Sequence, residues 1–387
     1  SVQGNKMKKR VLMVHNFYQT GGGEHTVFKN ETELLQQEGH FVKVYTKDNS
    51  CLKGNFLKLL TVPLSTLFSL GTYLDVKKII KEEKIDIVHC HNTFPLISPS
   101  VYYAAWSCKV PVVQTVHNFR FVCANGLLYR NGKICEDCLN GGCKAINHGC
   151  YRNSKVQTIP VVAMQKLHSM LGTYKRLNYI FLTEFNKNKI MPKLDIKGKV
   201  FIKPNFVKKT EIIANIVVDK NKFIFVGRLD EYKGIEFLLE FFSEHKEYTL
   251  CIYGEGSLEE KVKSFSKKYE NIRYMGFKPH EEMEQDWQSS CALIFSSLLY
   301  ETMGMTVVES MARGVPIICT SIGNPANIVN DGNAGVHFEM KNSDSLAKAI
   351  EKIQIDRNYY SQNAAEAAKK YYKEENYIKL CSIYDEI

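Results

Sequence analysis

The stretch VLMVHNFYQTGGG, residues 11–23, holds a short apolar run that leads into three consecutive glycines. Such a run is typical of a buried strand, and the apolar spacing of 24–37, which Gly39 ends, predicts a helix after it. The same unit recurs at FIFVGR, residues 223–228, before a helix predicted from about Gly234. These stretches predict an α/β protein whose parallel strands alternate with helices.

The alternation continues on both sides of Pro204-Asn205, where the pattern restarts. Two doubly wound, Rossmann-like domains that face each other across a cleft are therefore expected, residues 7–204 and 205–365. A C-terminal helix at 366–387 is expected to pack back on the first domain. Further strands are predicted at 41–45, 85–89 and 110–115 in the first half, and at 250–254, 272–276, 292–295 and 315–320 in the second.

Composition excludes several classes of protein. The 387 residues are 44% hydrophobic and 24% charged, with 21 Phe and 21 Tyr, which suits two globular domains and argues against disorder or low complexity. The polar, basic start at 1–10 has no apolar stretch of a signal peptide, so a cytoplasmic chain with reduced cysteines is expected. The apolar segment 56–74 contains Lys58 and Pro63, which favours a core or interfacial helix over a membrane span.

The charge is unevenly distributed. Residues 1–210 carry 31 Lys and Arg against 13 Asp and Glu, whereas residues 211–387 carry 20 against 28. A basic half favours an anionic partner. Because no nucleic-acid-binding motif is present, the inner face of the cytoplasmic membrane is the expected surface and nucleic acid is not an expected partner.

The motif ETMGMTVVE, residues 301–309, predicts a ligand site. Gly304 lets a ligand approach the main chain, and a helix beginning near Met305 offers unpaired N–H groups for phosphate. Glu301 and Glu309 flank that turn and can accept hydrogen bonds from ligand hydroxyls. Two ordinary surface acids are the alternative interpretation.

Together with Arg228 and Lys233 and with GEG at 254–256, this motif resembles the retaining glycosyltransferases of family 4, which have the GT-B fold. The resemblance runs from Val11 to about Ile353. It implies that Glu309 binds the nucleotide ribose, that Glu301 acts at the transferred sugar, and that the two cations neutralise the diphosphate. The donor contacts it implies are Gly21, Gly22, Gly23, Arg228, Lys233, Gly254, Gly256, Phe277, Thr302, Met303, Gly304, Met305 and Glu309.

The resemblance also covers a histidine in the first half. His117 follows a predicted strand where the family has a His that contacts the sugar, so Glu301 and His117 are the implied catalytic pair. The family often has Asp after that His, and here the residue is Asn118. The family's Gly-Gly-x-Pro-Glu run is replaced by GNPAN at 323–327, so Asn327 stands in place of the acid. A core histidine is the alternative for His117.

The cysteines of the loop 123–153 form a possible metal site. Cys135, Cys138, Cys143 and Cys150 could bind a structural zinc ion, although the spacing is irregular. The alternative is a set of reduced thiols.

The predicted function is retaining transfer of a sugar from a nucleotide-diphosphate donor, with a UDP-sugar favoured over a GDP-sugar and no catalytic metal. The implied acceptor is a glycan or a polyprenyl-diphosphate-linked glycan, as in bacterial polysaccharide and O-antigen (lipopolysaccharide) synthesis, by an enzyme peripheral to the membrane. A nucleotide-sugar epimerase on the same fold is one alternative. A non-catalytic protein that binds nucleic acid or zinc is the other.

Overall fold

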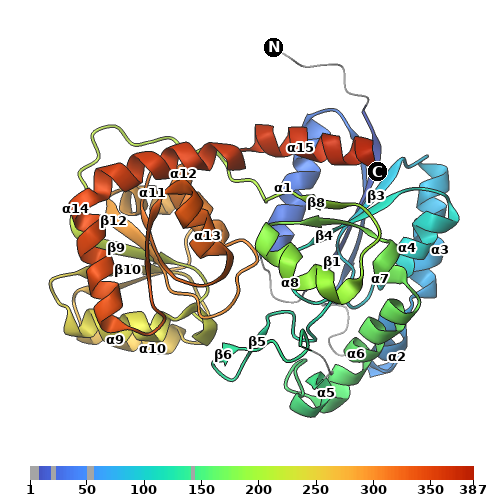
Figure 1. Ribbon diagram of the computed structural model, residues 1–387, viewed down its shortest axis with the longest axis horizontal. Coiled ribbons are helices and arrows are strands. Elements are labelled where there is room, and N and C mark those ends of the chain that lie inside the picture. Colours follow the sequence, from blue (N-terminus) through green and yellow to red (C-terminus); the bar gives the residue numbers. More distant parts are fainter. Residues whose placement is uncertain (1–7, 19–22, 50–55, 141–143) are drawn as a thin grey trace. The chain divides into compact units, whose positions relative to one another are not determined.

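The computed structural model describes residues 8–18, 23–49, 56–140 and 144–387, and the chain divides into two compact units (Figure 1). Unit 1 comprises residues 1–128, 135–205 and 373–387, and unit 2 comprises 129–134 and 206–372. Each unit contains a six-stranded sheet. The predicted fold class is confirmed, since both sheets are parallel and alternate with helices, as in the GT-B fold.

Unit 1 is built on the sheet order β2-β1-β3-β4-β7-β8. The helix after β1 leads to β2 on one side, and the next connection leads to β3 on the other, so the strand order reverses between β1 and β3. Its strands are β1 (Arg10–Phe17), β2 (Phe41–Asp48), β3 (Ile87–Asn92), β4 (Val112–Val116), β7 (Asn178–Phe181) and β8 (Val200–Ile202). Its helices are α1 (Gly23–Gln37), α2 (Phe56–Leu67), α3 (Leu70–Glu82), α4 (Ser100–Ser107), α5 (Ala145–His148), α6 (Lys155–Met170), α7 (Thr173–Arg176), α8 (Glu184–Leu194) and α15 (Lys373–Glu386).

Unit 2 repeats the design with the sheet order β11-β10-β9-β12-β13-β14. Its strands are β9 (Asp219–Val226), β10 (Thr249–Tyr253), β11 (Ile272–Gly276), β12 (Ser290–Phe295), β13 (Ile317–Thr320) and β14 (Gly335–Phe338). Its helices are η2 (Glu231–Lys233), α9 (Ile235–Glu244), α10 (Glu259–Lys268), α11 (His280–Gln288), α12 (Met305–Ala312), α13 (Gly323–Gly332), α14 (Ser343–Ala368) and η3 (Lys369–Tyr371).

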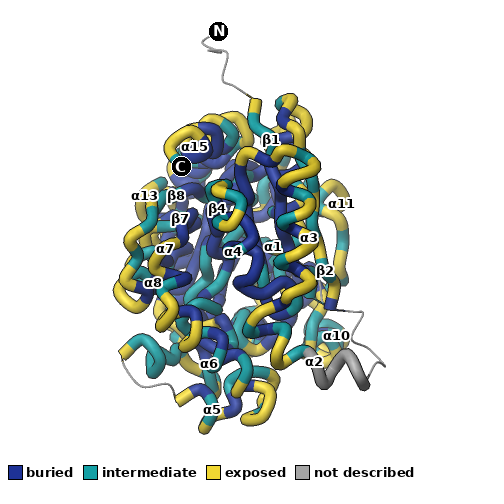
Figure 2. The backbone as a smooth tube through the Cα atoms, turned by 90° about the vertical axis from the view of Figure 1, so that its right-hand side faces the viewer, coloured by how far each residue is buried: buried dark blue, intermediate teal, exposed yellow. Residues whose placement is uncertain are grey.

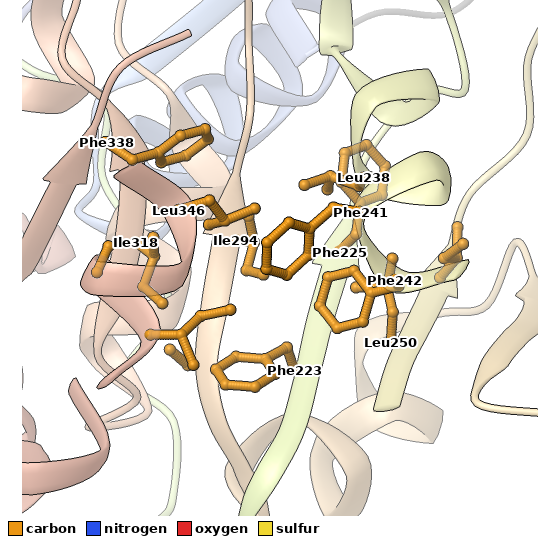
Figure 3. Close-up of a cluster of buried hydrophobic side chains, with 14 of the residues drawn as sticks. Phe223, Phe225, Leu238, Phe241, Phe242, Leu250, Ile294, Ile318, Phe338 and Leu346 are labelled. Atoms are coloured by element: carbon orange, nitrogen blue, oxygen red, sulfur yellow. The ribbon is translucent and has the colours of Figure 1, made fainter. Parts of the chain in front are cut away.

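The cores form where the helices cover the sheets. All five residues of β4 and the last three of β7 are buried, and Figure 2 shows that the helices expose one face and bury the other. In unit 2, Phe223 and Ile294 of the sheet pack against Phe241 and Phe242 of α9 and Leu346 of α14 (Figure 3). Continuous apolar strands are expected in a parallel sheet that is covered on both faces.

The C-terminal helix α15 belongs to unit 1 although α14 belongs to unit 2. Leu380, Ile383 and Tyr384 of α15 are buried in the same cluster as Val11 and Phe28. Buried apolar side chains of this kind stabilise the attachment of the helix to unit 1.

Two segments differ from their sequence interpretation. The hairpin of β5 (Tyr129–Arg130) and β6 (Lys133–Ile134), expected in the first domain, belongs to unit 2 because Tyr129 packs on Leu298 and Leu299.

The apolar segment 56–74 contributes to two helices, because the Ser69 side chain accepts a hydrogen bond from the Thr72 amide and caps α3. Among the described residues, no helix combines the length and apolar character that crossing a bilayer requires.

Candidate functional site

The candidate site of unit 2 lies where the strand order of its sheet reverses. Strands β9 and β12 are neighbours, but the chain leaves β9 toward β10 on one side and returns to β12 on the other. Ligands of open α/β sheets bind beyond the carboxyl ends of strands at such a point. The loop 227–234 follows β9 and the loop 296–304 follows β12, so both loops begin at this edge.

Arg228 is held by a carboxylate that sequence reasoning missed. Its Nε donates to Oδ2 of Asp230 at 2.7 Å, and the Tyr232 hydroxyl donates to the same oxygen at 2.9 Å. The other oxygen accepts from the Ser257 amide and hydroxyl at 3.1 and 2.9 Å. Burial alone would raise the pKa of Asp230, but these hydrogen bonds to the ionised form lower it to about 2. The Arg228 side chain is still half exposed and can meet a ligand.

Lys233 and Glu301 are brought together across the reversal point. Lys233 Nζ lies 2.5 Å from Glu301 Oε1, which also accepts from the Ser297 hydroxyl at 2.8 Å. The Ser296 hydroxyl donates to the Lys233 carbonyl at 2.8 Å and ties the two loops further. Both charged side chains are mostly buried, with 21% and 16% exposed. An ammonium has three N–H donors, so this ion pair leaves Lys233 with donors for an anion.

Gly304 forms the turn at the start of α12. Its φ of 78° lies in the left-handed region, and a Cβ there would come within 2.9 Å of Pro325 Cγ. Asn324 supports the preceding turn by donating to the Met303 carbonyl at 3.0 Å. The first two amides of α12, those of Met305 and Thr306, have no partner within the helix and can bind an anion, whereas the Val307 amide donates to the Gly304 carbonyl at 3.0 Å. Thr302 lies in the same turn.

The other donor contacts predicted in unit 2 surround this edge. Glu309 lies one turn into α12 with its side chain 19% exposed, and burial raises its pKa. Gly254 and Gly256 follow β10, where a Cβ on Gly254 would come within 1.8 Å of the Gly227 carbonyl oxygen. Phe277 follows β11 and is 69% exposed.

In unit 1, His117 follows β4 and lines a pocket with Asn92, Asn118 and Arg120. Its Nε2 lies 2.9 Å from Nδ1 of His91. Asn118 donates to Glu24 Oε2 at 3.3 Å. Gly23 is the first residue of α1, whereas the predicted contacts Gly21 and Gly22 lie outside the described residues.

Behind His117 lies a charged network of which the sequence indicated only His91. Glu31 of α1 accepts from Lys203 Nζ at 2.6 Å and lies 3.2 Å from His91 Nε2. Glu31 and Lys203 are far apart in the chain, and no motif marks either of them. The signal for His91 is the polar segment HCHN, residues 89–92, at the end of the strand predicted at 85–89.

Two groups of described side chains bring metal-ligand atoms within 4.8 Å of one another, His15 with Glu24 and His25, and Glu31 with His89 and His91. In the second group the carboxylate already pairs with Lys203, which disfavours a cation. In the first, both ring nitrogens of His15 and Oε1 of Glu24 are buried without a hydrogen-bond partner. Burial lowers the pKa of His15 to about 2, so its ring is neutral.

The cysteine site stays a prediction. Cys143 lies outside the described residues, and Cys135, Cys138 and Cys150 do not form a metal-ligand group among the described residues. Cys138 and Cys150 pack against a hydrophobic cluster that includes Phe94. Zinc analysis of the purified protein would test the prediction.

Comparison with known proteins identifies the class of enzyme. Residues 208–371 match the family of glycosyl transferases group 1, and residues 21–137 match glycosyltransferase family 4. The chain is a glycosyltransferase with the GT-B fold. Neither match describes an epimerase or a nucleic-acid-binding protein, the two alternatives raised from the sequence.

This glycosyltransferase is similar to the following two relatives and two solved structures. A glycosyltransferase of Methanocaldococcus jannaschii is 24% identical over 78% of this chain and 75% of its own length. A 41.2 kDa protein in the cps region of Klebsiella pneumoniae is 24% identical over 93% and 94%. Sucrose-phosphate synthase of Thermosynechococcus elongatus has a TM-score of 0.70 at 15% identity, covering 98% and 99%. Anabaena HepE in complex with UDP has a TM-score of 0.66 at 15% identity, covering 98% and 100%.

Proposed function

We propose that this glycosyltransferase moves a sugar from a UDP-sugar to a glycan or lipid-linked acceptor, with retention at the anomeric carbon. The Lys233–Glu301 ion pair carries the proposal, because it joins the two loops at the reversal point of the unit 2 sheet. A cation beside the N-terminus of α12 can bind a diphosphate, and the acid paired with that cation can accept a hydrogen bond from a sugar hydroxyl.

The chemistry assigned to these residues is charge stabilisation. The bond between the anomeric carbon and the phosphate oxygen breaks, the acceptor oxygen bonds to the same face of that carbon, and the acceptor proton passes to the leaving phosphate. Negative charge grows on the diphosphate as the bond breaks. Arg228, Lys233 and the first amides of α12 are fixed donors that stabilise this charge.

The donor and acceptor classes rest on different observations. UDP is favoured because the structurally similar HepE was solved with UDP, and also with UDP-glucose. A role in surface polysaccharide synthesis is favoured by the Klebsiella relative in the cps region. The basic first 210 residues favour a phosphate-bearing acceptor at a membrane surface.

The experiment is a transfer assay with a panel of UDP- and GDP-sugars and with short glycans and polyprenyl-diphosphate glycans as acceptors, in which product anomers are assigned by NMR. We expect transfer from a UDP-sugar with retention. Arg228→Met should lower the rate by roughly 100-fold or more, the usual cost of losing one donor to a developing anion. Lys267→Met, at an exposed lysine of α10, is the matched control.

Transfer from GDP-sugars alone, or inversion of the anomer, would contradict the proposal. Wild-type rates in the Arg228 variant would refute the assignment of the site.

A further inference from the structure

A hydrogen-bonded chain of buried side chains leads from α1 to the pocket of unit 1. It begins at Lys203 and Glu31, passes through His91 of β3 and ends at His117 after β4. Lys203 and Glu31 are each 1% exposed, and the His91 side chain is fully buried. Polar groups buried to this degree are tolerated only when their hydrogen bonds are satisfied, so the directions of these bonds are constrained.

The proton on His91 is placed by charge balance. Lys203 lies 2.6 Å from one oxygen of Glu31 and compensates its charge, so a protonated His91 would be a second buried cation without a counter-ion. A neutral imidazole carries one proton. Because the carboxylate of Glu31 can only accept, the proton of His91 lies on Nε2, 3.2 Å from Glu31 Oε1. Nδ1 of His91 is therefore an acceptor.

The same reasoning places the proton on His117. Its Nε2 lies 2.9 Å from Nδ1 of His91, which accepts, so His117 donates from Nε2. Burial lowers the pKa of His117 well below its usual value, so the ring carries only this proton. Nδ1 of His117 then keeps its lone pair. Among the described residues no hydrogen bond to this nitrogen is present, and His117 lines the pocket with Asn118 and Arg120.

We propose that His91 is a positioning residue that, with Glu31, holds His117 in the Nε2–H form and so keeps Nδ1 as an acceptor for a sugar hydroxyl in the pocket. The identity of the hydroxyl rests on the proposed function, whereas the placement of the protons does not. The hydrogen bond of one ring nitrogen sets which form of an imidazole is present.

The network also ties the C-terminal helix to this site. Asn376 of α15 accepts from Lys203 at 3.2 Å, and the Tyr384 hydroxyl of α15 lies 2.7 Å from Nδ1 of His89. His89 is buried on the same strand as His91, but its other nitrogen lies 2.7 Å from the Thr115 hydroxyl. The Nδ1 of His89 also lies 3.5 Å from Oε1 of Glu31, but His89 has no hydrogen bond to His117. It therefore serves as a control for the loss of a buried imidazole beside Glu31.

The first test is nitrogen NMR of the intact protein labelled with ¹⁵N-histidine, because it reports which ring nitrogen carries the proton. We expect His117 to show a single Nε2–H form near neutral pH. His91→Phe should give a mixture of both forms. His91→Gln should restore the Nε2–H form, since its amide can donate to Glu31 and its carbonyl can accept from His117. His89→Phe should leave His117 unchanged.

A wild-type spectrum with the proton of His117 on Nδ1, or with a charged ring, would overturn the proposal without any variant. This outcome does not depend on whether the substituted chains fold.

The second test is kinetic. His91→Phe should lower kcat for sugar transfer by about tenfold or more, the size of effect known for the hydrogen-bond partners of metal-binding histidines, with a nearly unchanged KM for the donor. His91→Gln should recover most of this loss, and His89→Phe should affect kcat much less. Wild-type kcat in His91→Phe would overturn the positioning role. An absence of transfer by the wild type would instead refute the proposed function and leave the NMR result standing.

Discussion

At the scale of single residues, Asp230 controls how Arg228 is presented. Its two oxygens accept four hydrogen bonds from side chains and the Ser257 amide. Asp230 is 7% exposed, so removal of its charge leaves buried donors with a weaker acceptor. Asp230 therefore both stabilises the loop 227–234 and orients the Arg228 side chain.

We therefore expect Asp230→Asn to lower the free energy of unfolding by about 1–3 kcal/mol and to weaken UDP binding. The free energy is measured by urea unfolding and the affinity by calorimetry. Asp331→Asn, at an exposed position, is the control. Unchanged UDP affinity in Asp230→Asn would show that Arg228 needs no support from Asp230.

Charge stabilisation by Arg228 and Lys233 also predicts the response to chelators. If these cations and α12 neutralise the diphosphate, transfer after treatment with EDTA should stay within about twofold of the untreated rate. The assay is the transfer reaction, with circular dichroism to verify the fold. A loss of transfer that a divalent ion restores would contradict this expectation and direct attention to His15, Glu24 and His25.

At the scale of elements, the start of α12 depends on one backbone conformation. Gly304 has a φ of 78°, and Pro325 leaves no room for a Cβ. An alanine there must either strain the backbone or shift the helix end whose amides face the proposed diphosphate.

Gly304→Ala is therefore expected to destabilise the fold by roughly 1–3 kcal/mol and to weaken UDP binding about tenfold or more. Gly71→Ala is the matched control, since Gly71 lies in α3 and a Cβ there meets nothing within 4 Å. That substitution should be neutral or stabilising by up to about 1 kcal/mol. Equal effects of the two variants on UDP binding would contradict the role of the Gly304 turn.

At the scale of the whole molecule, the buried histidines of unit 1 make stability depend on pH. A histidine titrates near 6.5 in the unfolded chain, whereas burial lowers the pKa of His15 to about 2 and the pKa of His89 and His117 well below the usual value. Below pH 6.5 the unfolded chain therefore binds protons that the folded chain does not. Glu24, whose pKa burial raises from 4.5 to about 7, acts in the opposite direction and offsets one of these protons.

The net effect is a fall in the free energy of unfolding of roughly 1–2 kcal/mol between pH 6.5 and 5.5, because a histidine of the unfolded chain is only half protonated at pH 6.5 and a full proton is equivalent to about 1.4 kcal/mol per pH unit. Urea unfolding at several pH values measures it. His15→Leu should reduce the slope of the free energy of unfolding against pH by the equivalent of about one proton. The substitution removes no hydrogen bond, because both ring nitrogens of His15 lack a partner. A slope unchanged in this variant would show that His15 is not the neutral group described.

The sequence alone was sufficient for the fold class, whereas the site residues that it indicated remain predictions. Apolar runs that end in glycines, such as those at 11–23 and 223–228, reflect the local geometry of a strand that leads into a turn. The family resemblance, which rests on these runs and on the motif at 301–309, predicted the GT-B fold. Lys233 and Glu301 were each predicted as site residues, but their direct contact was not.

The tertiary structure alone decided which distant residues meet. Lys233 and Glu301 are 68 residues apart, Glu31 and Lys203 are 172 apart, and α15 returns to unit 1 after the whole of unit 2. Periodicity reports which face of an element is buried, but not which element covers it. The partners of a buried charge follow from the order of strands in the sheet and the packing of helices upon it, and these arise from contacts over the entire chain.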